Sequence, residues 1–210
     1  MIVLFLFLKI NDVVAIKENE FYNERGGNNM NNEIIKIALA YSLGSDMHEV
    51  WRATRKRNDG TYEPRIKKST DEDWNIIHGT DTVDIANCTF EELPSNWQYE
   101  NLEAAKVAIN CVYDKVMNRE NITQEELEQM ASIIHDEWLK RNDYIFGPID
   151  QGGNPDYAVP YNQLPREEQL KDLAQLKPAQ DKVQDYIDGL IDIEQICEQY
   201  HLPTSERKIK

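Results

Sequence analysis

Two histidines in this sequence have the type and setting for proton transfer. His48 is followed by Glu49 and His135 by Asp136, and each histidine precedes a tryptophan by three positions. A histidine beside a carboxylate can act as a general acid or base because its pKa lies near neutrality. Neither copy is accompanied by a nucleophile, a glycine-rich phosphate loop or a zinc motif. We therefore interpret both as structural or ligand-orienting residues that hydrogen-bond a helix to a later Leu-Pro segment, and we expect no enzymatic activity.

Aromatic and basic residues follow each histidine and have the types needed to bind an anionic aromatic ligand. A Trp or Tyr ring can stack on a base while a guanidinium group holds a phosphate. The candidate ligand-binding residues are Trp51, Arg55, Arg57, Tyr62, Trp138, Arg141, Tyr144 and Phe146. If a twofold arrangement brings the two groups together, they form one shared cleft for an anionic nucleotide. The alternative is that Trp51 and Trp138 are core anchors and the surface is purely structural.

The cysteines and histidines predict neither a metal site nor a disulfide framework. Cys197 and His201 lie four positions apart, which suits one face of a helix, but no second pair accompanies them. The 3 cysteines are widely spaced and form no CxxC pair, which indicates thiols in a reducing compartment. We expect a cytoplasmic protein without a cofactor.

The charge balance limits the partners of the chain. Lys and Arg number 23 against 38 Asp and Glu, which gives a formal net charge of -15. An acidic chain repels a polyanion unless a basic stripe faces its phosphates, and the only such stripe covers residues 52–68. We therefore expect no nucleic-acid polymer as a partner, whereas a small anion is compatible with the stripe. A solvated helix end and hairpin is the alternative interpretation. From residue 30 onward no apolar segment is long enough to cross a membrane.

The chain repeats itself from residue 33 onward. Three blocks recur in the same order: MHEVW (47–51) with IHDEW (134–138), KRND (56–59) with KRND (140–143), and FEELP (90–94) with YNQLP (161–165). The loops between the blocks differ in length, as expected when duplicated units diverge at the surface. We predict two tandem units, 33–117 and 120–200, each a helix, a β-hairpin and a helix. Neither has much core alone, so they should pack about a pseudo-twofold axis in a mainly helical α+β fold.

Caps and apolar spacing predict the opening helix of each unit. Thr123-x-x-Glu126 is a capping box, and apolar residues at helical spacing follow it, so we predict an amphipathic helix over 124–141. The first unit has the same spacing over 37–51. Gly44 interrupts that helix at a cost of about 1 kcal/mol, which continued burial can offset.

Each unit is predicted to close with a helix after its Leu-Pro pair. Ser95-x-x-Gln98 has the form of a second capping box. Pro178 should break or kink the corresponding helix of the second unit, after which the apolar pattern continues to about residue 200. The predicted strands between the helices cover 62–65 and 83–90 in the first unit and 144–148 and 157–161 in the second.

The order of these motifs resembles the RyR repeat of ryanodine receptors, which also occurs in short bacterial and phage proteins. The second unit carries the resemblance in Ile134-His135-x-x-Trp138, Phe146-Gly147-Pro148, Val159-x-Tyr161-x-x-Leu164-Pro165 and Glu168. The first unit departs from the pattern, with Glu63 in place of a glycine and an acidic insertion at 69–81. Any shared site is therefore expected to be altered in the first copy.

The resemblance implies a binding module and no channel activity, because paired RyR repeats of the receptors are cytosolic and lie outside the pore. Free-standing microbial RyR domains are suspected of recognising nucleotide-derived ligands, and a receptor repeat pair can bind adenine nucleotide. We accordingly expect a non-enzymatic module that senses or sequesters a nucleotide or nucleotide-derived messenger. The alternative is a structural module that docks a protein partner through an acidic surface, for example around Glu125, Glu126 and Glu128.

The two ends of the chain are expected to lie outside the repeated units. The run RGGNNM (25–30) reads as an in-frame ribosome-binding site, spacer and start codon, so we predict that Met30 is the natural start and that 1–29 is non-native or disordered. The apolar run at the beginning lacks the cleavage site and basic start of a signal peptide. Residues 201–210 are polar and predicted to form a flexible tail.

Overall fold

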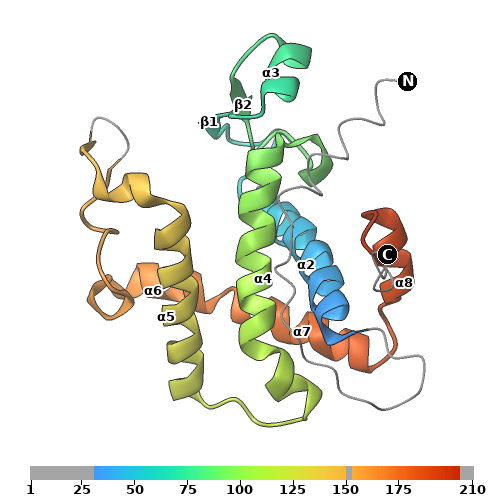
Figure 1. Cartoon of the computed structure of the whole chain (residues 1–210). Coiled ribbons are helices and arrows are strands. Elements are labelled where there is room, and N and C mark those ends of the chain that lie inside the picture. Colours follow the sequence, from blue (N-terminus) through green and yellow to red (C-terminus); the bar gives the residue numbers. More distant parts are fainter. Residues whose placement is uncertain (1–30, 150–152, 204–210) are drawn as a thin grey trace, which may run out of the picture.

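The computed structural model describes residues 31–149 and 153–203, and these residues are mainly helical (Figure 1). The helices and strands, in chain order, are α2 (Asn32–Thr54), β1 (Ile66–Lys68), α3 (Glu72–His78), β2 (Thr82–Asp84), α4 (Ser95–Met117), α5 (Gln124–Arg141), α6 (Arg166–Leu173), α7 (Leu176–Ile187) and α8 (Ile193–Gln199). Short 3-10 helices are η1 (Phe90–Glu92), η2 (Asp143–Phe146) and η4 (Tyr161–Gln163). Strands β1 and β2 form an antiparallel pair with Lys67 opposite Val83. The predicted mainly helical class is confirmed, but the described residues contain one hairpin, and two matching helix–hairpin–helix units are not evident in them.

Helix α4 is the centre of the packing, and α2, α5 and α7 all contact it (Figure 1). Its buried residues include Leu102, Ala105, Ile109 and Val112, whose spacing of three or four forms one apolar stripe. Helices α2 and α4 approach closely at Gly44, where an added Cβ would lie 3.3 Å from the Leu102 Cα. The glycine that weakens α2 locally therefore permits this approach.

Local hydrogen bonds explain where the two long helices of the middle region begin. Helix α5 has the predicted bounds, and its capping box is formed: the Glu126 backbone N–H donates to Thr123 Oγ1 at 3.3 Å, and the Thr123 N–H donates to Glu126 Oε2 at 2.9 Å. Helix α4 begins at Ser95, directly after the Leu-Pro pair as predicted. The capping box predicted there is wrong, because Pro94 is the N-cap and makes no side-chain hydrogen bond. The amide of Gln98 bonds instead to carbonyl groups of the preceding turn.

The first strand of the first-half hairpin lies further along the chain than the predicted 62–65, whereas the second overlaps the start of the predicted 83–90. An isolated bridge joins Lys56 and Tyr62, whereas β1 and β2 flank the acidic insertion. This insertion contains α3, whose N-cap Asp71 accepts from the Trp74 N–H at 3.0 Å. The second oxygen of Asp71 accepts from the Ser95 N–H at 2.9 Å. The insertion is therefore fastened to the start of α4.

The second half does not contain the predicted hairpin in its described residues. Helix η2 lies over most of the predicted strand 144–148, and the predicted strand 157–161 is a turn that ends at the first residue of η4. The Gly147 N–H donates to the Tyr144 carbonyl at 2.9 Å, and the Leu164 N–H donates to the Tyr161 carbonyl at 3.1 Å. These short-range bonds satisfy backbone groups that a hairpin would pair across strands.

The closing helix of the second half is divided into α6, α7 and α8. The break predicted at Pro178 falls before it, at residues 174–175, and Pro178 lies in the first turn of α7, where its missing N–H is tolerated. A second break follows at Gly189, whose φ of 72° is left-handed. The predicted continuation of one apolar pattern to residue 200 is therefore wrong.

Two predictions on the chain ends fall on residues without a structural description. The segment 1–29 lies outside the described residues, and so does the 204–210 part of the predicted tail. Within residues 31–149 and 153–203, no helix is long and apolar enough to cross a membrane. The same residues contain no group of three His, Cys, Asp or Glu side chains placed to hold a metal ion.

Candidate anion-binding site

The two histidines make matching contacts. His48 Nε2 lies 3.0 Å from the Cys88 carbonyl oxygen, and His135 Nε2 lies 2.9 Å from the Val159 carbonyl oxygen. Each carbonyl precedes by two positions the aromatic residue that opens η1 or η4. Both histidines are buried, with exposures of 3% and 4%. The contacts agree with the structural interpretation, in which each histidine fastens a helix to the segment before Leu-Pro.

Glutamine and tryptophan side chains complete both connections. Gln98 Nε2 lies within 3.2 Å of three carbonyl oxygens of residues 90–93, and Gln169 Nε2 donates to the carbonyl of the residue that opens η4 at 3.0 Å. Trp51 and Trp138 lie beside the histidines, with centroid separations of 5.7 and 6.0 Å. Both tryptophans are half-buried and anchor the helix ends.

The first group of candidate residues is engaged within its own region. The guanidinium carbon of Arg55 lies 5.5 Å from the Trp51 ring centroid, and its Nε donates to the Glu63 carbonyl at 3.1 Å. Arg52, which is outside the predicted set, lies over the Tyr62 ring at 4.8 Å. These cation–π contacts hold the end of α2 against the chain that leads to β1. The rings and guanidinium groups are thus already used by the fold.

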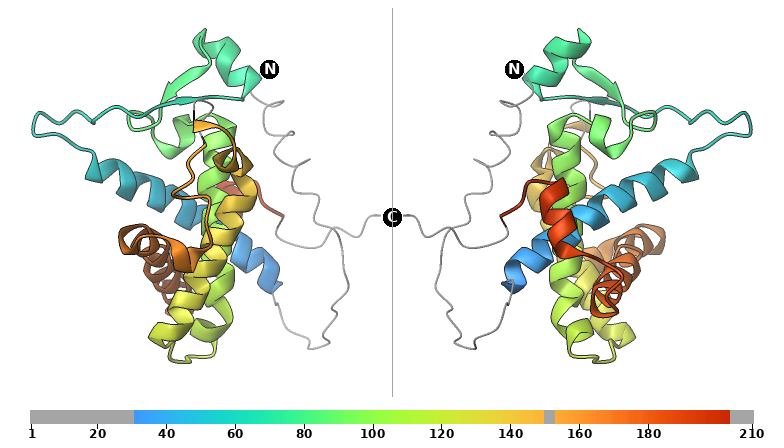
Figure 2. Two further views of the ribbon diagram at one scale, coloured as in Figure 1. Left: turned by 90° about the vertical axis from the view of Figure 1, so that its left-hand side faces the viewer. Right: turned by 90° about the vertical axis from the view of Figure 1, so that its right-hand side faces the viewer.

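The two candidate groups do not meet in a shared cleft. The connection between α2 and β1, which carries Arg57, projects away from the C-terminal end of α5 (Figure 2). Phe146, beyond α5, is 61% exposed. Trp138 lies against His135. From the predicted set, Arg141 and Tyr144 alone belong to the cluster described next.

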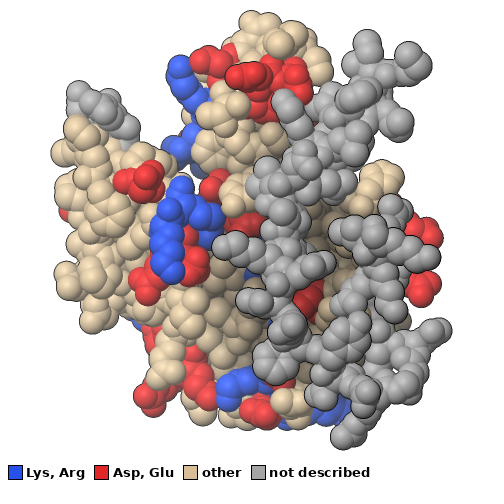
Figure 3. Space-filling view, in the orientation of Figure 1, with Lys and Arg blue, Asp and Glu red and all other residues tan. Residues whose placement is uncertain are grey.

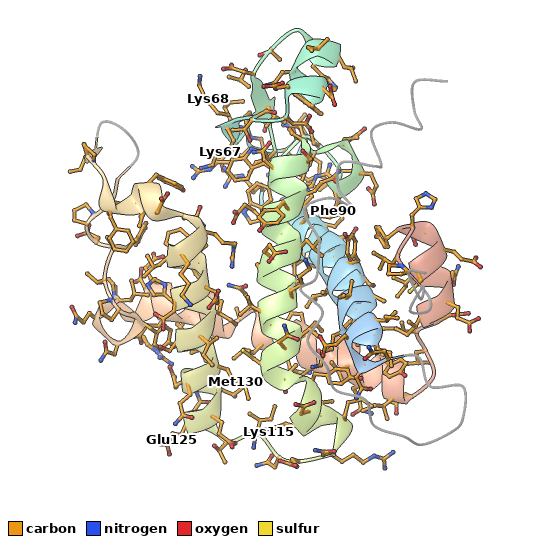
Figure 4. The ribbon with its side chains drawn as sticks, viewed as in Figure 1. Lys67, Lys68, Phe90, Lys115, Glu125 and Met130 are labelled. Atoms are coloured by element: carbon orange, nitrogen blue, oxygen red, sulfur yellow. The ribbon has the colours of Figure 1, made fainter. Side chains whose placement is uncertain are left out.

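A different set of basic and aromatic side chains converges between β1, the first turns of α4 and the end of α5. We call it the cationic–aromatic cluster, and its members are Arg65, Lys67, Trp97, Tyr99, Glu100, Arg141 and Tyr144. Lys67 Nζ lies 5.4 Å from the centroid of the Trp97 ring, whose Nε1 donates to the Lys68 carbonyl at 2.9 Å. Figure 4 places Lys67 near the N-terminal end of α4, on the side where α5 lies.

Members of the cluster lie close enough to change one another's protonation. Burial, and then the positive charge of Arg65, lowers the pKa of Lys67. Burial, and then the Glu100 carboxylate, raises the pKa of Tyr144, and Arg65 opposes this rise. Arg65 therefore acts on residues of both β1 and η2, which joins the two sides of the cluster electrostatically.

Arg141 has an unfilled hydrogen-bonding position inside the cluster. Its side chain is 14% exposed, and its buried Nε has no hydrogen-bond partner among the described residues. Glu100 Oε2 lies 3.6 Å from this nitrogen, which is an ion-pair contact but too long for a hydrogen bond. Burial raises the pKa of Tyr99, and Arg141 partly offsets the rise, so the guanidinium charge acts on that ring. The Nε–H can therefore donate a hydrogen bond to an anionic oxygen.

The cluster has an excess of positive charge in an acidic chain. Arg65 and Lys67 have no carboxylate within ion-pair distance in the part of the chain that the structure describes, whereas Glu100 is paired with Arg141. Figure 3 shows Lys and Arg side chains gathered on this face, between the hairpin and the upper end of α5. The chain as a whole carries -15. The cluster therefore has the sign of charge that favours a small anion and aromatic rings of the type that stack on a base.

Arg141 and Tyr144 could be predicted from the sequence as candidate residues, whereas their partners on β1 and α4 could not. Arg65 and Lys67 belong to the basic stripe, yet nothing in their spacing connects them with α5. Trp97 carried a usable signal, because it lies off the apolar stripe of its helix and so needs a partner outside the core.

Comparison with protein-family models, curated proteins and solved structures gives no match to this chain. The ligand class is therefore assigned from the geometry of the cluster.

Proposed function

We propose that the chain is a non-enzymatic binding module whose ligand is a nucleotide or nucleotide-derived small molecule, held at the cationic–aromatic cluster. The observation that carries the proposal is the unsatisfied Arg141 Nε, in a cluster that also holds two cations without carboxylate partners among the described residues. A phosphate group would accept from Arg141 and offset the charges of Arg65 and Lys67. A base would stack on a ring of the same cluster, such as the 48% exposed Tyr144. The cluster thus offers both parts of a nucleotide a partner.

We further propose that the two halves, residues 33–117 and 120–200, derive from one RyR-like unit. Its support is the repetition of detailed contacts: a histidine to a carbonyl, an aromatic residue two positions later, and a glutamine that bonds back to it. Helices α4 and α7, which close the two halves, contact each other, as a pseudo-twofold arrangement requires. The halves differ where the second lacks a hairpin, so the repeated part is the helix and its connection to the Leu-Pro segment.

An acidic docking surface has less support as the alternative. Lys115 Nζ donates to Glu126 at 2.6 Å, and Tyr161 Oη donates to Glu128 at 2.6 Å. Of the three carboxylates considered, these two stabilise contacts of α5 with its neighbours. Within this example group only Glu125 is left without such a contact among the described residues.

A thermal-shift screen of the full chain tests the proposal. ATP, ADP-ribose and cyclic nucleotides are compared with inorganic phosphate, since a ligand that binds the folded chain raises its Tm by mass action. A rise with at least one nucleotide and none with phosphate supports a site for both base and phosphate. No rise with any nucleotide at millimolar concentration contradicts the proposal.

Variants locate the site. Arg141→Gln and Lys67→Gln each remove a cation from the cluster, and loss of a charge-assisted hydrogen bond should raise the Kd about tenfold to a hundredfold. Arg57→Gln is the matched control, because it removes the same charge from an exposed position on the α2–β1 connection. Isothermal titration calorimetry gives the three affinities. An equal loss in the Arg57 and Arg141 variants would contradict the assignment to the cluster.

A further inference from the structure

The buried His135 ring contacts two partners, the Val159 carbonyl and an acidic side chain. A carbonyl oxygen only accepts hydrogen bonds, so the ring nitrogen that faces Val159 at 2.9 Å, Nε2, must carry a proton. The other nitrogen, Nδ1, lies 3.4 Å from Asp172 Oδ2. The His135 and Asp172 side chains are only 5% and 15% exposed. Water therefore contributes little to this pair.

The geometry of the pair favours a proton between its two members. With Nε2 protonated and no further proton, the Nδ1 lone pair would face a carboxylate lone pair in a buried place. One proton removes this repulsion, either as an imidazolium that donates to the carboxylate or as a carboxyl group that donates to Nδ1. In both forms the contact between α5 and α6 depends on holding that proton.

The matching contact of the first half lacks the acid. His48 Nε2 faces the Cys88 carbonyl in the same way, so it too carries the proton. The residue seven positions after the Leu-Pro proline is Asp172 in the second half and Asn101 in the first. The Asn101 amide donates to the Trp97 carbonyl at 2.9 Å. Within the described residues His48 has no carboxylate at ion-pair distance.

Charged groups on each neighbouring element act on the two contacts. Asp172 is faced by Glu168 and Lys171 on its own helix, and by His135 on α5. Tyr161 on η4 also faces it, although the Tyr161 hydroxyl is already bonded to a carboxylate of α5.

His48 has a different set of neighbours. Glu49 and Arg52 on α2 have opposite charges and pair with each other at 2.7 Å, and Glu91 on η1 adds a weaker influence. Among the described residues neither carboxylate lies at ion-pair distance from the His48 ring, unlike Asp172 beside His135.

We propose that mild acidification acts in opposite directions on the two histidine contacts, consolidating the docking of α5 on η4 and α6 while weakening the docking of α2 on η1. The chain would thus carry a pH-sensitive device in which one half loosens and the other tightens. This device does not depend on the ligand proposed for the cationic–aromatic cluster.

The direction of each effect follows from proton binding. Burial raises the pKa of Asp172 to about 6, with His135 opposing the rise, so its contribution is present in acid and is lost as the pH rises through about 6. Burial lowers the pKa of His48, and the Cys88 carbonyl opposes this. The unfolded chain therefore takes up a proton at His48 first, and stability is lost as the pH falls below the ordinary histidine value of about 6.5.

Urea unfolding of the full chain at about pH 5 and about pH 7.5 tests the proposal, since one linked proton changes the unfolding constant by up to tenfold per pH unit. Relative to wild type, Asp172→Asn should unfold up to about tenfold more readily at the lower pH than at the higher. His48→Gln keeps a donor for Cys88 and removes the titrating ring, so it should change in the opposite sense. Profiles parallel to wild type in both variants would overturn the proposal.

A measurement on the unaltered chain covers the case in which a variant does not fold. Long-range nitrogen–proton NMR of the histidine rings should show Nε2 protonated in both His48 and His135, with the His48 ring taking up its second proton at a lower pH than an ordinary histidine. Protonation of His48 at its ordinary pH, or an Nδ1-protonated neutral ring for either residue, would overturn the proposal.

Discussion

Helix propensity and tertiary packing predict opposite effects of Gly44→Ala on the free energy of unfolding. By helix propensity alone, alanine in the middle of α2 should stabilise the chain by about 1 kcal/mol. In the folded protein an added Cβ would lie 3.3 Å from the Leu102 Cα and 3.4 Å from the Asn101 carbonyl carbon and oxygen. Those atoms belong to the backbone of α4 and cannot move aside as a flexible side chain would.

The magnitude follows from the two opposing terms. Carbon atoms in contact prefer separations of about 3.5–4.0 Å, so α2 and α4 must separate by a few tenths of an ångström to accept the methyl group. Overpacking of this kind costs about 1–3 kcal/mol, against the gain of about 1 kcal/mol in propensity. The expected result is a net loss of about 1 kcal/mol in the free energy of unfolding, and Gly44→Val should lose more.

Urea unfolding followed by circular dichroism measures this change. A loss of 1 kcal/mol corresponds to a fall in Tm of about 2–4 °C for a chain of this length. Val50→Ala is the control on the same helix, because Val50 is 67% exposed and only propensity should act there. It should stabilise the chain by about 0.5 kcal/mol. If Gly44→Ala stabilises the protein as Val50→Ala does, the close approach of α2 and α4 is wrong.

Two further predictions concern the Leu-Pro segments and a buried thiol. Gln98→Ala should destabilise the chain by about 1 kcal/mol more than Gln169→Ala, because Gln98 serves three carbonyl groups and Gln169 one; equal losses in urea unfolding would contradict this. Burial raises the pKa of Cys111 to about 11, so iodoacetamide at about pH 8 should label it about a hundredfold more slowly than in the unfolded chain. Peptide mass spectrometry gives the rate, which should increase toward the raised pKa, and labelling at the unfolded rate would contradict the burial.

Features that depend on neighbouring residues could be predicted well. The bounds of α5 followed from its capping box and helical spacing, because both rest on contacts within one or two turns. The start of α4 was also correct, although the reason given for it, a box between Ser95 and Gln98, was wrong. A local pattern can therefore place an element correctly while the side chain that forms the pattern has a different partner.

Features that depend on competition between local and distant partners could not be predicted. The second half has apolar and turn residues suited to a hairpin, yet η2 and η4 satisfy the same backbone groups by short-range bonds. Pro178 was expected to end a helix and instead lies in the first turn of one. In both cases the local sequence permits two conformations, and packing against α4 and α5 selects one.

The sequence by itself determined the repeated blocks, the helices that carry them, and the expectation that His48 and His135 hydrogen-bond a helix to the Leu-Pro segment. The tertiary structure decided that the two groups of candidate residues stay apart and that Arg141 meets Glu100 and lies in one cluster with Lys67. The reason is the range of the interactions. Caps and helical stripes act within a few residues, whereas the cluster requires α4, α5 and β1 to pack in one particular arrangement, which no spacing along the chain specifies.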